Sequence, residues 1–237
     1  MNILITGASK GIGFELAKIF ASNDDHTVIA VARTESKLQE LKNACIRENL
    51  RSKLRIVVFD IENTENLKNQ FKNEILKHVH SIDVLINNAG VLINKPFHEN
   101  SPDDMLKTFQ INAISPAIII QELLPLIKEG THKHVINISS MGGFQGSAKF
   151  PGLSFYSSSK AALANLTECL AEEYKVENIA FNCLALGAVN TEMLNSAFPD
   201  VKAPLEPHEI ASFIYDFALN GNKFFNGKII PVSSSTP

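Results

Sequence analysis

The chain alternates between short apolar runs and amphipathic helical patterns, and this alternation constrains its fold more than any other feature. Runs such as I-L-I and V-I-A-V-A are almost entirely apolar and therefore predict a sheet that is covered on both faces. Strands that alternate with helices predict right-handed crossovers and a parallel sheet. The expected strands are Asn2–Thr6, Thr27–Ala32, Leu54–Phe59, Val84–Asn87, His134–Ser139, Ile179–Leu184 and Lys228–Val232.

Helical patterns fill most of the intervals between these runs. No Pro/Ser-rich linker, low-complexity tract or internal repeat interrupts the alternation, and 45% of the 237 residues are hydrophobic. A chain of this size and composition can bury one sizeable core. We therefore predict a single doubly wound α/β domain over residues 1–237, with helices on both faces of the sheet. The expected helices are Gly11–Ser22, Glu35–Asn49, Thr64–Lys77, Pro102–Lys128, Phe155–Lys175 and Pro207–Leu219.

Charge and cysteine usage restrict the partners and the compartment. Lys plus Arg total 22 and Asp plus Glu total 25, with no long basic run, so neither nucleic acid nor an anionic membrane is an expected partner. Cys45, Cys169 and Cys183 are scattered and form no C-x-x-C spacing, which predicts buried free thiols in a reducing compartment. The first residues already have strand character, without a signal-peptide pattern, and no apolar stretch approaches the roughly 18 residues that span a bilayer. We expect a soluble, cytoplasmic protein.

A glycine-rich loop, T-G-A-S-K-G-I-G at Thr6–Gly13, follows the first expected strand and opens the first helix. Glycine permits positive φ and a close approach of the backbone to phosphate. The helix N-terminus adds unpaired N–H groups and a partial positive charge. The loop can be an ordinary strand-to-helix turn, but its place after the first strand predicts binding of a dinucleotide pyrophosphate. The expected contacts are Gly7, Ser9, Lys10, Gly11, Ile12 and Gly13.

The end of the second strand predicts which dinucleotide binds. A carboxylate at this point would hydrogen-bond the adenosine ribose and repel a 2′-phosphate, but the chain has Ala32, Arg33 and Thr34 there. Arg33 and Lys10 together can bind a 2′-phosphate through charge-assisted hydrogen bonds, so we expect NADPH rather than NADH. Two alternatives stay open: both cations can be solvated surface residues, and Glu35 can reach back toward a ribose.

Tyr156 and Lys160 lie four positions apart in the run Y-S-S-S-K, so on a helix they share one face. A cation beside a phenol stabilises the phenolate and lowers a pKa that is about 10 in water. Such a phenol can give a proton to a carbonyl oxygen or take one from an alcohol. Together with Ser139, Ser140 and the glycine-rich loop, the pair predicts hydride chemistry with a nicotinamide cofactor. Alone, the tyrosine would be an ordinary amphipathic-helix residue and the lysine a solvated one.

Five motifs in this order resemble the short-chain dehydrogenase/reductase family, over essentially the whole chain. They are the glycine-rich loop, N-N-A-G at Asn87–Gly90, F-Q-I-N-A around Asn112, I-N-I-S-S ending at Ser140, and Y-S-S-S-K. The resemblance implies a Rossmann-type domain with a seven-stranded sheet in the order 3-2-1-4-5-6-7. It also implies a homodimer or homotetramer, in which the small residues Ala162 and Ala164 would let a second subunit pack closely.

The resemblance further implies roles for individual residues. Tyr156 would be the general acid or base, and Lys160 would lower its pKa and contact the nicotinamide ribose. Ser140 would orient the substrate carbonyl, and Asn112 would hold a water that links Lys160 to solvent. The implied cofactor contacts, besides the glycine-rich loop, Arg33, Tyr156 and Lys160, are Asp60 and Ile61 at the adenine, Asn87 and Gly90 at the adenosine-side ribose, Val189 and Thr191 at the nicotinamide amide, and Thr34, Asn88, Ala89 and Gly187.

Two segments depart from the family pattern. Ser140 stands 16 positions before Tyr156, a longer gap than usual, so the loop Met141–Ser154 carries a small insertion. This leaves open which serine is catalytic, and we favour Ser140, with Ser139 in a packing or capping role. After the sixth expected strand, Leu186 precedes Gly187 where the family has proline, so the backbone there lacks proline's fixed φ.

The expected function is NADPH-dependent reduction of a ketone or other carbonyl to an alcohol, with 3-oxoacyl thioesters or small carbonyl compounds as candidate substrates. Alcohol oxidation stays open, because equilibrium and cofactor ratio decide the direction, and so do epimerisation and dehydration on the same fold. A non-catalytic NAD(P)-binding sensor or scaffold is the alternative of another class. The set of tyrosine, lysine, serine and asparagine argues against it, since a binder needs no acid/base.

The remaining signals concern the substrate pocket and metals. Several apolar residues in two Gly/Pro-bearing loops predict an apolar pocket, although they can equally anchor the loops by packing. The pairs His78/His80 and His132/His134 lack a third clustered ligand, so no metal site is expected. The apolar loop residues are Phe144, Phe150, Phe155, Met193, Leu194 and Phe198.

Overall fold

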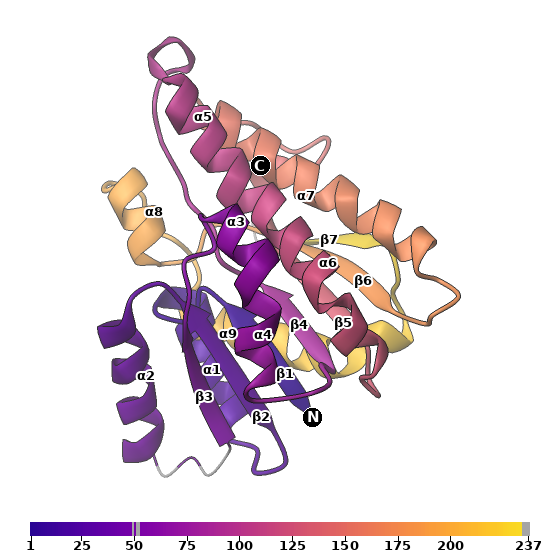
Figure 1. Ribbon diagram of the computed structural model, residues 1–237. Helices are drawn as coiled ribbons and strands as arrows, with labels where there is room; N and C mark the ends of the chain where they lie inside the picture. Colours follow the sequence, from indigo (N-terminus) through magenta and orange to yellow (C-terminus); the bar gives the residue numbers. More distant parts are fainter. Residues whose placement is uncertain (49, 51–52, 234–237) are drawn as a thin grey trace.

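The computed structural model describes residues 1–48, 50 and 53–233, and its centre is a seven-stranded sheet in the order β3-β2-β1-β4-β5-β6-β7 (Figure 1). Every neighbouring pair of strands is parallel, which confirms the predicted fold class and strand order. The strands are β1 Asn2–Thr6, β2 Thr27–Ala32, β3 Lys53–Val58, β4 Val84–Asn87, β5 His134–Ser140, β6 Ala180–Leu186 and β7 Lys228–Val232.

Two strand ends extend further than the sequence predicts. Ala185 and Leu186 were expected to lie beyond the sixth strand, but they pair with Ser139 and Ser140 and continue the ladder of β5 and β6. The side-chain pattern alone does not show this, because small and apolar residues suit a strand end and a loop equally well. The extension brings Ser140 and Leu186 to the same edge of the sheet.

Helices cover both faces of the sheet: in Figure 1, α1 and α9 lie behind it, and α4 and α6 lie in front. Short π-helical segments at Leu67–Phe71 and Gln110–Ile114 join α3 to α4 and α5 to α6. The end of the second expected helix, Asn49, lies outside the described residues. The helices are α1 Gly11–Ala21, α2 Glu35–Arg47, α3 Thr64–Asn66, α4 Lys72–Leu76, α5 Pro102–Phe109, α6 Ser115–Lys128, α7 Ser154–Glu173, α8 Glu192–Ala197 and α9 Pro207–Asn220.

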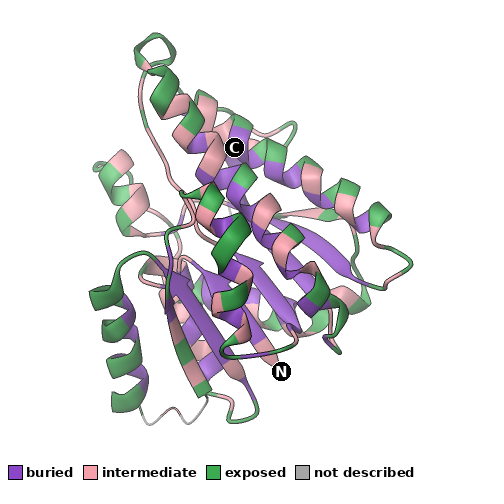
Figure 2. Ribbon diagram, viewed as in Figure 1, coloured by how far each residue is buried: buried purple, intermediate pink, exposed green. Residues whose placement is uncertain are grey.

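The core has two halves, one on each face of the sheet (Figure 2). Ile3 and Ile5 of β1 belong to the half that includes α1 and α9, whereas Leu4 belongs to the half that includes α6. All three side chains are fully buried. Successive residues of a strand point to opposite faces, so a strand of a doubly covered sheet needs apolar residues at every position.

The segment Pro102–Lys128 is helical throughout its 27 residues and, by length and composition, is apolar enough to cross a membrane. This corrects the expectation that no stretch of the chain meets that criterion. Half of its most apolar window is buried inside the protein. Ile119, Ile120 and Leu123 pack into the core half on the α6 face of the sheet. The apolar composition of this helix thus reflects core packing.

The sheet also determines where a ligand can bind. The chain builds β1, β2 and β3 outward, then returns so that β4 lies on the other side of β1. At such a reversal the loops that follow the two central strands diverge and leave a crevice at the carboxyl edge.

Candidate active site

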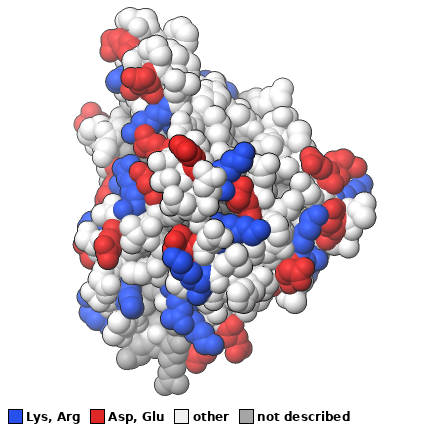
Figure 3. All heavy atoms as spheres, viewed as in Figure 1, with Lys and Arg blue, Asp and Glu red and all other residues white. Residues whose placement is uncertain are grey.

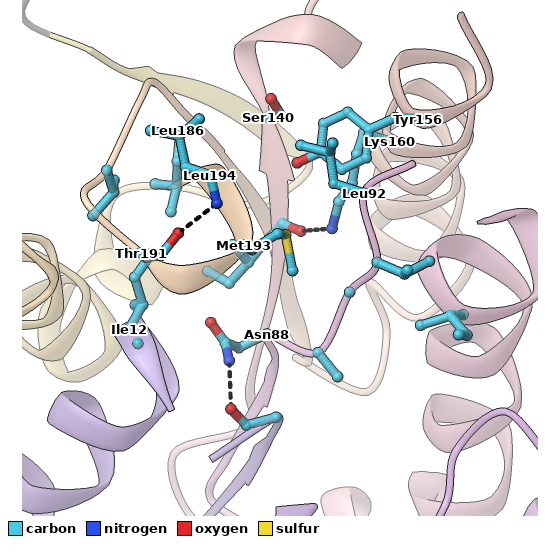
Figure 4. Close-up of a pocket in the computed structure, with 18 of the residues that line it drawn as sticks. Ile12, Asn88, Leu92, Ser140, Tyr156, Lys160, Leu186, Thr191, Met193 and Leu194 are labelled. Carbon is cyan, nitrogen blue, oxygen red and sulfur yellow. Dashed lines mark hydrogen bonds between the residues drawn. The ribbon is translucent and has the colours of Figure 1, made fainter. Parts of the chain in front are cut away.

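A cavity of about 490 Å³ opens at this carboxyl edge, a volume typical of small-molecule sites. Its walls come from the loops that follow β1 to β6, together with residues of α5, α7 and α8. Figure 4 shows that residues far apart in the sequence, among them Ile12, Asn88, Tyr156 and Thr191, surround this one space.

The glycine-rich loop forms one end of the cavity. Gly7 and Gly11 have φ of +69° and +55°, a conformation that favours glycine. A Cβ on Gly13 would lie 2.4 Å from the Gly7 carbonyl oxygen, so a side chain at that position would push the loop apart. Gly13 therefore serves the packing of α1 against the loop and does not itself line the cavity.

The N-N-A-G segment after β4 holds the glycine-rich loop in place. The Asn88 side-chain amide donates to the carbonyl oxygens of Thr6 and Gly7, at 3.0 and 3.3 Å. The Thr6 hydroxyl accepts from the backbone N–H groups of Asn88 and Ala89, both at 3.1 Å. Asn87 is turned into the sheet, where its amide donates to Asn137 at 2.9 Å. The two asparagines thus act mainly on the protein itself.

Charged side chains gather beside the glycine-rich loop. Lys10 pairs with Glu192 at 3.1 Å, linking the loop to the start of α8. Glu62 lies between two cations, 3.9 Å from Arg33 and 3.1 Å from Lys107 of α5. All five residues line the cavity. The Arg33 side chain is 65% exposed and its pairing is long, so it can turn toward an anionic ligand.

Tyr156 and Lys160 of α7 face the other end of the cavity, beside Ser140 at the end of β5 (Figure 4). The Ser140 hydroxyl accepts from Gly142 N at 3.2 Å, and its proximity to the phenol opposes the rise that burial causes in the pKa of Tyr156. Lys160 is 4% exposed, and its Nζ donates to the Ile138 carbonyl oxygen at 2.8 Å. A phenol, a hydroxyl and an ammonium group are thus held at one wall of the cavity.

The model of the short chain dehydrogenase family matches residues 1–202, which include the glycine-rich loop and the Tyr156/Lys160 pair. The chain belongs to this family. The resemblance drawn from the sequence motifs is thereby confirmed.

Relatives and solved structures agree with this assignment. A fatty acyl-CoA reductase of Acinetobacter baylyi is 34% identical over 215 residues, which cover 89% of this chain and 70% of that protein. A 3-oxoacyl-[acyl-carrier-protein] reductase of Chlamydia trachomatis is 28% identical over 97% of this chain and 94% of its own. A short chain dehydrogenase of Shigella flexneri, solved with NADP, has a TM-score of 0.87 at 28% identity and covers 97% of this chain and 95% of its own. The present chain, as a member of the same family, is therefore an oxidoreductase.

Burial controls the protonation of both catalytic candidates in this short chain dehydrogenase. Burial lowers the pKa of Lys160 to about 8. The pKa of Tyr156 is raised, because burial disfavours the phenolate more than the neighbouring Ser140 hydroxyl favours it. The expectation that Lys160 would lower this pKa is not met, because burial and Ser140 are the causes of the shift in the pKa of Tyr156. Tyr156 is therefore a protonated donor at neutral pH.

Asn112 and Ser139 connect the segments that form the wall with Ser140, Tyr156 and Lys160, which we call the catalytic wall. Asn112 is fully buried in the π-helical segment, accepts from Val91 N at 2.8 Å and donates to Ser159 Oγ at 3.0 Å. A Cβ built on Gly90 would lie 3.2 Å from Asn112 Oδ1 and 3.3 Å from Lys160 Nζ, so these groups converge on one point. The Ser139 hydroxyl donates to the Lys160 carbonyl oxygen at 2.8 Å and anchors α7 to β5.

Most of the residues expected from the sequence surround the cavity. Gly13, Thr34, Asn87 and Asn112 lie outside its lining. The expected residues that line it are Gly7, Ser9, Lys10, Gly11, Ile12, Arg33, Asp60, Ile61, Asn88, Ala89, Gly90, Ser140, Tyr156, Lys160, Gly187, Val189 and Thr191. Among the described residues, no group of three or more His, Cys, Asp or Glu is placed to hold a metal ion.

Sequence reasoning missed three charged residues of this site, Glu62, Lys107 and Glu192, and it took α8 for part of a loop. Thr191 caps α8 by accepting from Leu194 N at 3.3 Å, a signal that was present in the order T-E-M-L. No local signal marks Glu62 or Lys107, because their proximity depends on how α5 meets the sheet.

Proposed function

We propose that this protein is an NADPH-dependent carbonyl reductase in which Tyr156 is the general acid. One observation carries the proposal: Tyr156, Ser140 and Lys160 converge on one wall of a cavity whose other end has the glycine-rich loop and two cations. A protein that only senses or binds the dinucleotide would need the second end but not the first.

The residues present fit a nicotinamide dinucleotide. The positive φ of Gly7 and Gly11 leaves a cradle without side chains at the N-terminus of α1, where phosphate oxygens can approach backbone N–H groups. Gly90 leaves open the space beside Lys160 Nζ that a side chain would fill. When bound, the reduced nicotinamide would supply the hydride.

The chain's own groups would manage the charge and the proton. Negative charge grows on the substrate carbonyl oxygen during the reaction, and hydroxyl donors already in place stabilise it. Ser140 and Tyr156 supply these donors, and Tyr156 then gives its proton to the oxygen. The raised pKa of Tyr156 keeps that proton available at neutral pH, as proton donation in the reductive direction requires. Lys160 would contact the nicotinamide ribose once the cofactor is bound.

Arg33 and Lys10 support the choice of NADPH. The end of β2 itself, at Ala32, Arg33 and Thr34, carries no carboxylate that would repel a 2′-phosphate, and both cations line the cavity. Their present partners, Glu62 and Glu192, are exposed or half-exposed, so a doubly charged phosphate can compete for the two cations. The Shigella relative was solved with NADP and an Escherichia coli relative, 27% identical, with NADPH.

Tyr156→Phe tests the chemistry. The variant should bind NADPH within a few-fold of the wild type, because the ring remains, and should lose about 10²–10⁴-fold in turnover across a panel of ketones. Tyr174→Phe is the matched control, since it makes the same change at the C-terminal end of the same helix, outside the cavity lining. If the wild type binds NADPH but oxidises it with no ketone, a sensor or scaffold role replaces the proposal.

Arg33→Asp tests the cofactor. A lost charge-assisted hydrogen bond is commonly worth about 1.5–3 kcal/mol, so the preference for NADPH over NADH should fall at least about tenfold in fluorescence titrations. Lys42→Asp is the control, because Lys42 is an exposed lysine of α2 outside the cavity lining. An unchanged ratio in Arg33→Asp would contradict the assignment.

We also infer a homodimer or homotetramer of a single-domain subunit. Leu106 of α5 and Ile114 of the π-helical segment are 66% and 48% exposed, and Ala162 of the neighbouring α7 is exposed as well. Ala164, expected on the same outer face, is 3% exposed and belongs to the core side of α7. The apolar outer face is therefore made by α5 and α7 together. Light scattering that shows only monomer would exclude the oligomer.

A further inference from the structure

We infer, on the basis of the proposed function, that the substrate is an uncharged ketone whose carbonyl bears an apolar chain, and that this chain leaves the site between Phe150 and Val201. Neither the family assignment nor the relatives determine this, because short chain dehydrogenases of this fold can surround the same catalytic wall with different loops. Two segments close the catalytic end of the cavity: residues 141–153 after β5, and residues 187–206 after β6, which include α8.

Charge is distributed unevenly along the cavity. Lys10 and Glu192 pair with each other at the glycine-rich loop. Arg33, Glu62 and Lys107 form a connected group beside the end of β2. Apart from Lys160, which is buried beneath Tyr156, these charges and Asp60 after β3 belong to the cofactor end. A substrate carboxylate or phosphate at the catalytic wall would therefore meet no surface cation of the described lining.

The wall opposite Tyr156 is apolar. Figure 4 shows Leu186, Met193 and Leu194 across the cavity from Ser140 and Tyr156. Leu186 at the end of β6 is 6% exposed, as is Leu153, and Met141 is 7% exposed. A hydroxyl-rich substrate would press polar groups against these side chains without hydrogen-bond partners, which costs free energy, whereas an alkyl chain would not.

Two apolar side chains of the cavity lining are also exposed to solvent, and we therefore place them at its mouth. Phe150 is 52% exposed and Val201 is 46% exposed, and both line the cavity from different loops. Phe198 lines the cavity from the same loop as Val201. A ligand that reached from Ser140 to this rim would remove apolar surface of Phe150 and Val201 from water, which favours binding by a chain rather than by a small polar molecule.

A third segment, the loop after β4, fixes the distance between residues 141–153 and 187–206. We call the space between these two segments the slot. The Asn94 side-chain amide donates to the Ala197 carbonyl oxygen at 2.8 Å, at the end of α8. The next residue, Lys95, donates its backbone N–H to the Gly152 carbonyl oxygen at 3.1 Å. Gly152 has φ of +84°, and a Cβ there would collide with Asn94 Oδ1. One short segment thus spaces both loops, so the slot exists before substrate binds.

A homologous series of methyl ketones, from butanone to 2-decanone, tests the inference with NADPH and the intact protein. kcat/KM should rise about fourfold for each added methylene until the chain reaches the rim, and then level off. 2-Oxo acids of equal chain length and the ketose fructose should be at least about 100-fold poorer than the best ketone. A flat length series, or equal rates with the charged or hydroxylated compounds, would overturn the inference and leave the carbonyl reductase proposal standing.

The apolar chain of the substrate can belong to a free ketone or to a 3-oxoacyl thioester. An N-acetylcysteamine thioester of each chain length, run beside the ketones, distinguishes these sources, and a length dependence in either series supports the inference. If no compound oxidises bound NADPH, the carbonyl reductase proposal fails. Calorimetric titration with the ketones then tests separately whether the site prefers an apolar chain. Binding of 2-decanone at least tenfold tighter than butanone would support the slot, and equal affinities would overturn it.

Phe150→Ser identifies the slot as the origin of the length dependence. It should lower kcat/KM for 2-decanone about fivefold more than for butanone, mainly through KM. Phe224→Ser is the control, because Phe224 is 77% exposed and lies outside the cavity lining. Equal losses for butanone and 2-decanone in Phe150→Ser would contradict a chain that passes this residue.

Discussion

Replacing Lys160 with methionine should remove activity and, at neutral pH, make the folded protein more stable. Lys160 is 4% exposed, and burial lowers its pKa from 10.5 to about 8. Each pH unit between these values corresponds to about 1.4 kcal/mol, so the buried ammonium destabilises the fold by about 3 kcal/mol at pH 7. Methionine has a similar length and no charge to bury.

One lost contact opposes this gain. Lys160 Nζ donates to the Ile138 carbonyl oxygen at 2.8 Å, and methionine would leave that acceptor without this donor. A buried acceptor without a partner costs about 1–3 kcal/mol. The expected net gain in the free energy of unfolding is therefore about 0–2 kcal/mol, or up to about 8 °C in Tm for a chain of this size.

The pH dependence distinguishes this account from a simple packing effect. Between pH 8 and 10.5 the unfolded wild type binds more protons than the folded wild type, so its stability rises with pH in this window. The advantage of Lys160→Met should therefore shrink from pH 7 to pH 10. Wild-type kcat/KM should fall above about pH 8, where the ammonium loses its proton.

Guanidinium unfolding of the wild type and Lys160→Met at pH 7 and pH 10 measures these quantities. Lys175→Met is the matched control, since the Lys175 side chain is 67% exposed just after the same helix, and its stability should change by less than about 0.5 kcal/mol at either pH. A Lys160→Met protein that is less stable than the wild type by the same amount at both pH values would refute the reasoning.

Three further predictions concern the rest of the molecule. Burial lowers the pKa of His134 from 6.5 to about 4, so between these pH values the unfolded chain binds a proton that the folded chain does not. The free energy of unfolding should therefore fall by up to about 3 kcal/mol as pH drops from 6.5 to 4. Urea unfolding of His134→Gln should show a smaller change of this free energy with pH. Gly13→Ala should cost about 1–3 kcal/mol by thermal unfolding and weaken NADPH binding, because the new methyl group would strike the Gly7 carbonyl and the Asn88 amide. Glu192→Gln should tighten NADPH binding up to about fivefold and leave NADH binding unchanged, because it frees Lys10 to bind the 2′-phosphate. Titration of the variant with both cofactors measures this.

The fold could be predicted because its signals are local. Ile3, Leu4 and Ile5 are all apolar, and only a strand covered on both faces requires that pattern, so the buried sheet follows from a few consecutive residues. Of the strand boundaries, Ala180–Leu186 differs most from the prediction, since its last residues depend on the register with β5. The catalytic pair could be predicted equally well, because Tyr156 and Lys160 lie one helical turn apart and any α-helix places them on one face.

The sequence by itself determined the order of secondary structure, the glycine-rich loop and the residue types at the catalytic wall, since each depends on neighbours within a few positions. Only the tertiary structure decided the direction of the Tyr156 pKa, the inward turn of Asn87 and the position of Glu62 between Arg33 and Lys107. Burial and pairing energies depend on which groups meet across the fold and how much water they exclude, and neither quantity is encoded in a local pattern of residues.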